Sequence, residues 1–326
     1  MRSPFSRALR RPHNCLFIRL LPRHYATETP VNPGKPAIQS GQTSSPVKER
    51  DTEFSLPEGF TEENPCLYHD TLPPQPSQLA YAKHFFTRSK HSPVYLWGTD
   101  IFRTIPEAAI PEVVFIGRSN VGKSSIINAL VGEDICASSK KLGRTKLISA
   151  IGLGGTKNED SRIALVDTPG YGKGSQAEWG QEIQKYLEKR KQLRRIFLLL
   201  DGKVGLKPRD HDVLAFLRQF AVPYQLVLTK SDHTLGIDNR KKGCEPKASQ
   251  SGLFRLSQTA QNILSAARPL NPSMEGPGPL GDVIACSVQM ERKKRRRITT
   301  GINALQWAIL LATGFDQIPR GFKNKS

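Results

Sequence analysis

The sequence predicts an α/β protein with three layers, in which a mostly parallel six-stranded sheet carries helices on both faces. Short apolar runs of strand length alternate along the chain with longer amphipathic segments of helical period. A glycine-rich turn, Gly117 to Ser124, lies between the first of these runs and the first helix of this alternation. This strand-loop-helix layout indicates a fold of the P-loop NTPase type.

The expected strands are short runs rich in Val, Ile and Leu. They span 112–117, 147–153, 162–167, 195–201, 224–229 and 282–285. The first helix opens at Gly122 and places Ile126, Ile127 and Leu130 on its inner face. Further helices are expected at 177–192, 210–220, 254–267 and 299–312, the third of them inside a long insertion at 233–281.

The turn has the spacing G-x-x-x-x-G-K-S, which phosphate chemistry requires. Its glycines let the backbone curl close to the phosphates, so that successive N–H groups and a helix N-terminus face the anion. Lys123 adds positive charge, and the Ser124 hydroxyl is a hard ligand suited to Mg²⁺. A glycine turn without this function would not require Lys and Ser side by side. The residues expected to contact the nucleotide are Gly117, Arg118, Ser119, Asn120, Val121, Gly122, Lys123, Ser124 and Ser125.

A second motif follows the strand 162–167. Asp167 stands at the carboxyl end of that strand, where it is expected to hold the metal through water. Thr168 and Pro169 lead to Gly170, whose backbone N–H is expected to sense the γ-phosphate. The segment has the pattern D-x-x-G.

The third motif, Thr229-Lys230-Ser231-Asp232, follows the strand 224–229 and selects the base. Asp232 can accept two hydrogen bonds, from N1–H and from the 2-amino group of guanine, and adenine offers no such pair. An unpaired buried carboxylate is costly, so this residue discriminates strongly between the bases. Alone, the T-K-x-D pattern is weak evidence, but the order of the three motifs, each after its own strand, predicts GTP, with ATP a poor alternative.

With these motifs in this order, the chain resembles the EngB-type GTPases of the TrmE-Era-EngA-EngB-Septin-like group. The resemblance covers roughly 78–315. It rests on the stretches 111–130, 142–145, 167–172, 198–210 and 228–232. It implies a single G domain that hydrolyses GTP to GDP with Mg²⁺.

The resemblance also implies roles for two further loops. Thr145, with Gly143 and Arg144 beside it, matches the switch-I threonine and would be the second protein ligand of Mg²⁺ beside Ser124. The loop that supports the guanine maps onto Ala285, Cys286 and Ser287. The implied catalytic residues are Lys123, Thr145 and Gly170.

Tyr171 stands where Ras-like GTPases carry the glutamine that orients the attacking water. A tyrosine cannot do this in the same way. In related GTPases a P-loop asparagine helps to bind K⁺ near the phosphates, and Asn120 matches it. The alternative is that Asn120 caps local backbone N–H groups. We therefore expect slow intrinsic hydrolysis that K⁺ and a partner surface accelerate.

The N-terminus has the composition of a mitochondrial transit peptide, because Met1 to Thr27 contains six arginines and no acidic residue. Arg19 interrupts the apolar stretch that a secretory signal would need. The expected segments are a transit peptide at 1–26, a disordered linker at 27–77, the G domain at 78–316 and a basic tail at 317–326. The expected location is the mitochondrial matrix.

Composition narrows the class of partner. Five scattered cysteines indicate neither a zinc site nor a disulfide framework, and no apolar run approaches the ~18 residues of a membrane span. The formal net charge is +19, and the run Arg292 to Arg297 is its densest cluster. Such a surface favours phosphate backbones. The alternatives are a solvated loop or a nuclear localisation signal.

Three functions fit these patterns. The first is a mitochondrial GTPase, expected to be a monomer, that binds ribosomal RNA or a large-subunit precursor during ribosome assembly, as the resemblance implies. The second is a regulatory switch that binds a protein effector, for example in organelle division. The third is a GTP-binding scaffold with negligible turnover, which Tyr171 suggests.

Overall fold

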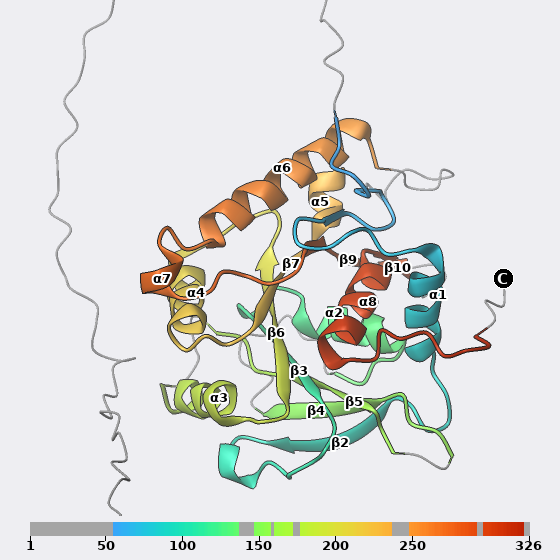
Figure 1. Ribbon diagram of the computed structural model, residues 1–326, viewed down its shortest axis with the longest axis vertical. Coiled ribbons are helices and arrows are strands. Elements are labelled where there is room, and N and C mark those ends of the chain that lie inside the picture. Colours follow the sequence, from blue (N-terminus) through green and yellow to red (C-terminus); the bar gives the residue numbers. More distant parts are fainter. Residues whose placement is uncertain are drawn as a thin grey trace, which may run out of the picture. The chain divides into compact units, whose positions relative to one another are not determined.

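The computed structural model describes residues 55–136, 147–157, 160–171, 177–236, 248–291 and 296–322. Within these ranges the centre is an eight-stranded sheet with the order β1-β8-β7-β6-β3-β5-β4-β2 (Figure 1). Four of its seven strand pairings are parallel, so the sheet is mostly parallel, as the sequence predicted.

The parallel strands form the middle of the sheet and carry the expected motifs at their carboxyl ends. They are β3 (Glu112–Gly117), β5 (Ile163–Asp167), β6 (Leu193–Asp201), β7 (Tyr224–Thr229) and β8 (Val283–Ala285). Antiparallel strands complete the two edges: β4 (Ile148–Leu153) and β2 (Val94–Thr99) at one end, and β1 (Cys66–Leu67) at the other. Every residue of β3 is buried, because helices cover both of its faces.

Helices lie on both faces of the sheet (Figure 1). The helices are α1 (Pro76–Phe85), α2 (Lys123–Val131), α3 (Ala177–Lys189), α4 (Pro208–Gln219), α5 (Ser231–Leu235), α6 (Gln250–Ala267), α7 (Pro272–Glu275) and α8 (Ile302–Thr313), with a 3₁₀ turn, η1, at Phe102–Thr104. Successive residues of β3 point to opposite faces. Val113 and Phe115 join the core under α1, α2 and α8, whereas Val114 and Ile116 join the core under α3, α4 and α6. The three-layer arrangement is confirmed.

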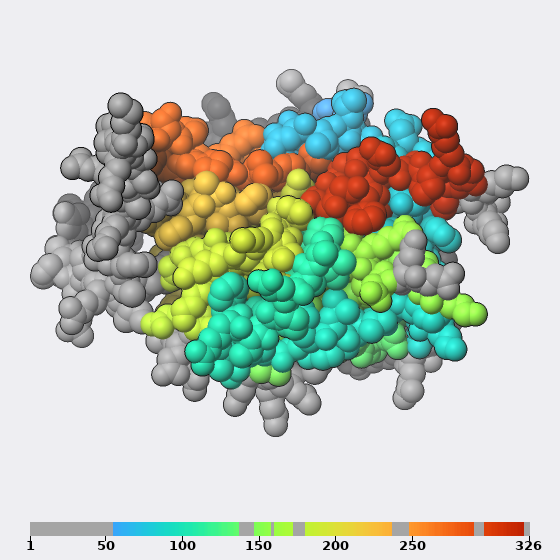
Figure 2. Space-filling view, turned by 60° about the horizontal axis from the view of Figure 1, so that its bottom comes forward, coloured from blue at the N-terminus to red at the C-terminus, as the bar shows by residue number. Residues whose placement is uncertain are grey.

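The strand count predicted from sequence was wrong, since the sheet has two more strands than expected. β1 lies inside the stretch 27–77 that was interpreted as linker, and it pairs with β8 through Cys66 and Ile284. β2 pairs with β4 and leaves Val94 and Tyr95 exposed. Both are edge strands with one hydrogen-bonded neighbour each, so neither needs the continuous apolar run by which strands are recognised. Figure 2 shows the teal surface that includes the β2 segment along one face.

Two of the expected helices begin at other residues than predicted. α6 begins at Gln250, four residues before the expected start, because the Ser249 side chain accepts a hydrogen bond from the backbone N–H of Gly252. The last helix begins at Ile302, since 296–300 form β10, which pairs with β9 (Ser287–Glu291) in a separate hairpin.

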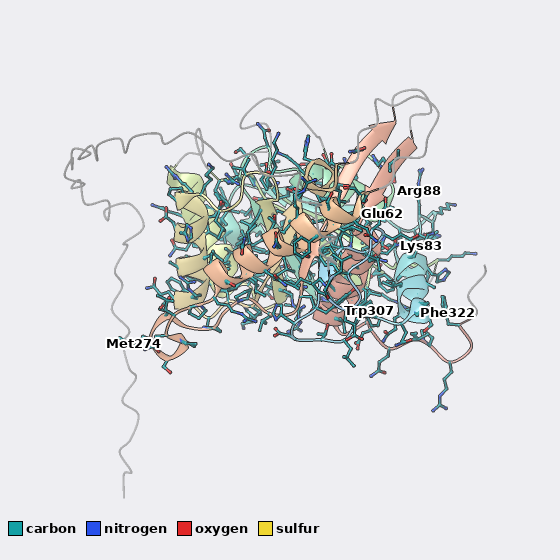
Figure 3. All side chains as sticks on the ribbon, turned by 90° about the horizontal axis from the view of Figure 1, so that it is seen from above. Glu62, Lys83, Arg88, Met274, Trp307 and Phe322 are labelled. Atoms are coloured by element: carbon teal, nitrogen blue, oxygen red, sulfur yellow. The ribbon has the colours of Figure 1, made fainter. Side chains whose placement is uncertain are left out.

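The described part of the C-terminal segment packs on the domain. The Phe322 ring lies 5.4 Å from the ring of Tyr81 and 5.4 Å from that of His84, both on α1 (Figure 3). Residues 317–322 of the expected tail therefore extend the core that includes α1 and α8. No helix of the described residues is long and apolar enough to cross a membrane.

Candidate nucleotide-binding site

The loop after β3 has the backbone conformation that its glycines predicted. Gly122 has φ of +109°, a conformation that side chains with a Cβ disfavour, and α2 begins at the next residue. A Cβ on Gly117 would lie 2.9 Å from the carbonyl oxygen of Leu199, so only glycine fits beside β6. Asn120 also has positive φ, 63°, and its side chain is exposed.

Lys123 and Asp167 form a buried ion pair. The Lys123 ammonium, at the start of α2, lies 2.7 Å from Oδ1 of Asp167, at the end of β5. Their side chains are 7% and 3% exposed, so solvent screens this pair little. The parallel pairing of β3 and β5 sets Asp167 opposite Phe115, and the hydroxyl of Thr168 donates to the Phe115 carbonyl. The Asp167 carboxylate, expected to lie on the metal side, is therefore fixed beside the phosphate loop.

The D-x-x-G segment lies directly against the phosphate loop. The backbone N–H of Ser119 donates to the carbonyl of Tyr171 (3.0 Å), and the N–H of Tyr171 donates to the carbonyl of Gly117 (3.1 Å). The Ser119 hydroxyl donates to the Gly170 carbonyl at 3.2 Å. A Cβ on Gly170 would lie 2.6 Å from the Ser119 nitrogen, so glycine is required at this position by the close approach of the two loops.

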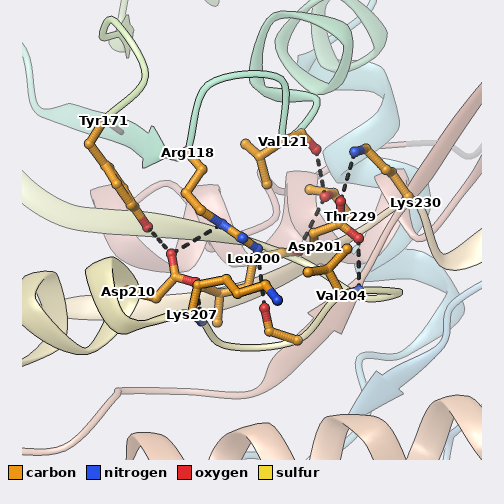
Figure 4. Close-up of polar contacts among 11 residues, drawn as sticks. Arg118, Val121, Tyr171, Leu200, Asp201, Val204, Lys207, Asp210, Thr229 and Lys230 are labelled. Atoms are coloured by element: carbon orange, nitrogen blue, oxygen red, sulfur yellow. Dashed lines mark hydrogen bonds and ion pairs between the residues drawn. The ribbon is translucent and has the colours of Figure 1, made fainter. Parts of the chain in front are cut away.

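Tyr171 and Arg118 both contact one buried carboxylate, that of Asp210 on α4, the first through a hydrogen bond and the second through an ion pair (Figure 4). The Tyr171 hydroxyl donates to Oδ1 at 2.7 Å, and the Arg118 Nε lies 3.3 Å from the same oxygen. Burial raises the pKa of Tyr171, and the charge of Asp210 adds to this effect, so the phenol stays protonated as a donor. The Arg118 guanidinium also donates to the Gly205 carbonyl. Its side chain is thus engaged by the segment that leads into α4.

The motif that was expected to select the base, 229–232, is attached to the phosphate loop by its threonine. The Thr229 hydroxyl, at the end of β7, is hydrogen-bonded to the carbonyls of Val121 (2.7 Å) and Leu200 (3.2 Å) (Figure 4). Lys230, with φ of 58°, donates to Oδ2 of Asp201 at 2.7 Å. Burial alone would raise the pKa of Asp201, but the Lys230 bond and two backbone N–H donors hold that pKa below its ordinary value.

Asp232 has a partner that the sequence did not indicate. The Gln289 amide on β9 donates to Oδ2 of Asp232 at 2.7 Å. The backbone N–H of Ser231 donates to the Cys286 carbonyl, which joins this motif to the loop at 285–287. Cys286 is buried beside Gly301, and burial raises the pKa of its thiol.

The structure therefore brings four predicted segments together: 117–125, 167–170, 229–232 and 285–287. Gly143, Arg144 and Thr145 lie outside the described residues. Asp201, Asp210 and Gln289 were missed as site residues. Two of them carry a local signal: Asp201 is an acid at the end of a strand, and Asp210 is an acid two residues after Pro208, where a helix begins. No local pattern marks Gln289.

The donor set fits Mg²⁺. Ser124 and Asp167 offer a hydroxyl and a carboxylate, both hard oxygen ligands, at the phosphate end of the site. In the described ranges no cluster of His, Cys, Asp and Glu forms a separate metal site. A magnesium ion that keeps several waters and binds the phosphates needs no such cage.

The fold and these loops define a GTPase of the P-loop class. A family model described as a 50S ribosome-binding GTPase matches residues 112–230. A probable GTP-binding protein EngB of Bartonella tribocorum is 42% identical over 148 residues, which are 43% of this chain and 69% of that protein. Its counterpart in Aquifex aeolicus is 33% identical over 184 residues, 54% of this chain and 90% of that protein. The chain belongs to the EngB family of GTP-binding proteins.

Among solved structures, the chain is similar to a crystal structure of a probable GTP-binding protein EngB. The match has 24% sequence identity and a TM-score of 0.39, and it covers 62% of this chain and 98% of that one.

Proposed function

We propose that this chain is a GTPase of the mitochondrial matrix that takes part in assembly of the large ribosomal subunit. The observation that carries the nucleotide part is the set of contacts joining the phosphate loop to both other motifs: Lys123 to Asp167, and Thr229 to the Val121 carbonyl. These contacts support one shared site in which the phosphate loop and the motif of the proposed guanine-reading carboxylate adjoin. GTP and GDP are the proposed ligands.

In this proposal the phosphate end of the site performs the hydrolysis. The N–H groups of the phosphate loop and Lys123 hold the phosphates, and Gly170 senses the γ-phosphate. Ser124, Asp167 through water, and Thr145 would hold Mg²⁺, which neutralises charge that develops on the phosphate oxygens. Because the Tyr171 hydroxyl is directed at Asp210, that side chain does not orient the attacking water, and slow intrinsic hydrolysis follows.

Asn120 remains the proposed K⁺ ligand. Its exposed side chain and left-handed backbone are compatible either with an ion site or with local capping. Asn120→Gly removes the amide and tolerates the positive φ. We expect faster hydrolysis in K⁺ than in Na⁺ and loss of that difference in the variant. Equal rates of the unaltered protein in the two salts would remove this role.

The ribosomal part of the proposal is supported by charge and by family. The matching family model is described as a 50S ribosome-binding GTPase. Of the net charge of +19, six positive charges precede residue 27, which leaves +13 that a targeting segment does not explain. The run Arg292 to Arg297 leads into β10, although 292–295 lie outside the described residues. Ribosomal RNA is the polyanion that fits this charge.

The first experiment is sedimentation of the full-length protein from mitochondrial lysate, with a non-hydrolysable GTP analogue or with GDP, across a salt series. We expect co-migration with large-subunit precursors under the analogue and release under GDP. A variant with Arg292→Gln and Lys293→Gln should dissociate from the precursor particles at a lower salt concentration than the unaltered protein does. The matched control carries Lys189→Gln and Lys191→Gln, two exposed positions with the same total charge change.

The main alternative is a switch that binds a protein effector. Migration at the top of the gradient under every nucleotide and salt condition would favour that alternative. Multiple turnover on ribosomal particles would exclude a scaffold with negligible turnover. A protein found outside mitochondria after fractionation would contradict the proposed location and the interpretation of 1–26 as a transit peptide.

A further inference from the structure

Asp210 is a fully buried carboxylate that contacts residues from two loops of the site. It is the third residue of α4, and its exposed fraction is 0%. The Tyr171 hydroxyl and the Arg118 Nε approach Oδ1, and the backbone N–H of Lys207 donates to Oδ2 at 2.8 Å. Neither the three nucleotide motifs nor the metal site includes this residue.

The side-chain partners of Asp210 belong to the phosphate loop and to the segment that follows the D-x-x-G motif. Arg118 is the second residue of the phosphate loop, and Tyr171 directly follows Gly170. The same two loops are already joined by backbone hydrogen bonds between Tyr171 and residues 117 and 119. Arg118 is held a second time through the Gly205 carbonyl. Figure 4 shows these side chains converging on the start of α4.

Loss of a hydrogen-bond donor from a buried carboxylate costs much free energy. This cost keeps the donors of Asp210 in place around it. Asp210 accepts one hydrogen bond at each oxygen, from the Tyr171 phenol and from the Lys207 backbone N–H, and the Arg118 guanidinium forms an ion pair with it. Movement of Tyr171 away from Asp210 would leave the phenol of a largely buried tyrosine without this acceptor. The position of Gly170 relative to the phosphate loop is therefore linked to this one side chain.

We propose that Asp210 is a positioning residue for GTP hydrolysis, which sets the distance between Gly170 and the phosphate loop through Tyr171 and Arg118. The role rests on the proposed function of Gly170 as the γ-phosphate sensor. It predicts a specific defect. Loss of the Asp210 contact weakens binding of GTP, which has a γ-phosphate, and leaves binding of GDP and the reading of guanine intact.

The test compares Tyr171→Phe, which removes only the hydroxyl, with Asp210→Asn. Asp212→Asn is the control, because it removes an exposed carboxylate on the same helix. Binding of a non-hydrolysable GTP analogue and of GDP is measured for each variant, together with kcat and KM for GTP. We expect Tyr171→Phe to weaken the analogue about tenfold and GDP less than about twofold, in keeping with loss of one hydrogen bond to a charged acceptor. kcat should fall along with analogue affinity.

The double variant identifies the shared contact. Tyr171→Phe should add little to Asp210→Asn, because the first change removes a bond that the second has already altered. If Asp210→Asn does not fold, as judged by its thermal transition, Tyr171→Phe alone decides the matter. An equal loss for both nucleotides, or lower thermal stability with unchanged nucleotide discrimination, would overturn the positioning role. An unaltered protein that binds neither nucleotide would overturn the proposed function itself, so the two failures are distinguishable.

Discussion

Lys123 donates to Asp167 across 2.7 Å in a part of the protein from which water is nearly excluded. Both residues were expected to act on bound ligands, the lysine on phosphate and the aspartate on the metal. In this structure each neutralises the other. A buried charge left without its partner is costly, so the pair holds the site together before any nucleotide binds.

Lys123→Ala should therefore have two effects. Binding of the magnesium complex of GTP should be abolished, because the positive charge at the phosphates is lost. The nucleotide-free protein should also be destabilised, on the order of 3 kcal/mol, because Asp167 is left buried and unpaired. Denaturant unfolding measures the second effect. Lys203→Ala, at an exposed position, is the control, and adding Asp167→Asn to Lys123→Ala should restore part of the stability. Unchanged GTP affinity in both Lys123→Ala and Ser124→Ala would contradict the assignment of the site.

Asp232→Asn should shift base preference from guanine to xanthine. The amide offers a donor where guanine also presents a donor, and this mismatch should weaken GTP by about 10- to 100-fold. Xanthine presents an acceptor at the 2-position and should gain affinity. Competition binding of GTP and XTP against a fluorescent nucleotide measures the exchange. Retained GTP affinity would show that another group selects the base.

Gln289 should hold the Asp232 carboxylate in the position that reads the base. A carboxylate has about four lone-pair positions, so the Gln289 amide and guanine can be accepted together. Gln289→Leu should weaken GTP and GDP by the same factor, about tenfold, because both carry the same base. Thr299→Ala, at an exposed position of the same hairpin, should change neither. Tighter binding in Gln289→Leu would mean that Gln289 competes with the base.

Lys230 should make stability depend on pH through Asp201. The pKa of Asp201 is lowered in the folded protein, so its contribution to the free energy of unfolding is present above its ordinary value of 3.8 and is lost as pH falls through the lowered folded value. Lys230→Met should reduce stability at neutral pH, and the difference from the unaltered protein should shrink below pH 3.8. Urea unfolding at a series of pH values tests this. A constant difference at all pH values would assign the effect of Lys230 to packing.

The parts of the fold that could be predicted from sequence share a strong local signal. β3, β5, β6 and β7 are buried apolar runs followed by turn or polar motifs, and each was expected within two residues of its observed bounds. β1 and β2 lack such a signal. β1 has only two residues, and it forms because the backbones of Cys66 and Leu67 pair with the outer edge of β8. No local pattern encodes a pairing between residues more than two hundred positions apart.

The sequence by itself determined the class of this protein, a P-loop GTPase, and predicted its phosphate loop, metal-side carboxylate and guanine-reading aspartate, each after its own strand. The spacing of residues along the chain is enough to predict these motifs, because each motif is formed within one turn and the start of one helix. Only the tertiary structure decided which partner each side chain meets. Lys123 pairs with Asp167, Tyr171 and Arg118 meet at Asp210, and Gln289 reaches Asp232. These four contacts join residues that are 39, 44, 57 and 92 positions apart. The packing of strands and helices, which local spacing does not specify, brings them within hydrogen-bonding distance.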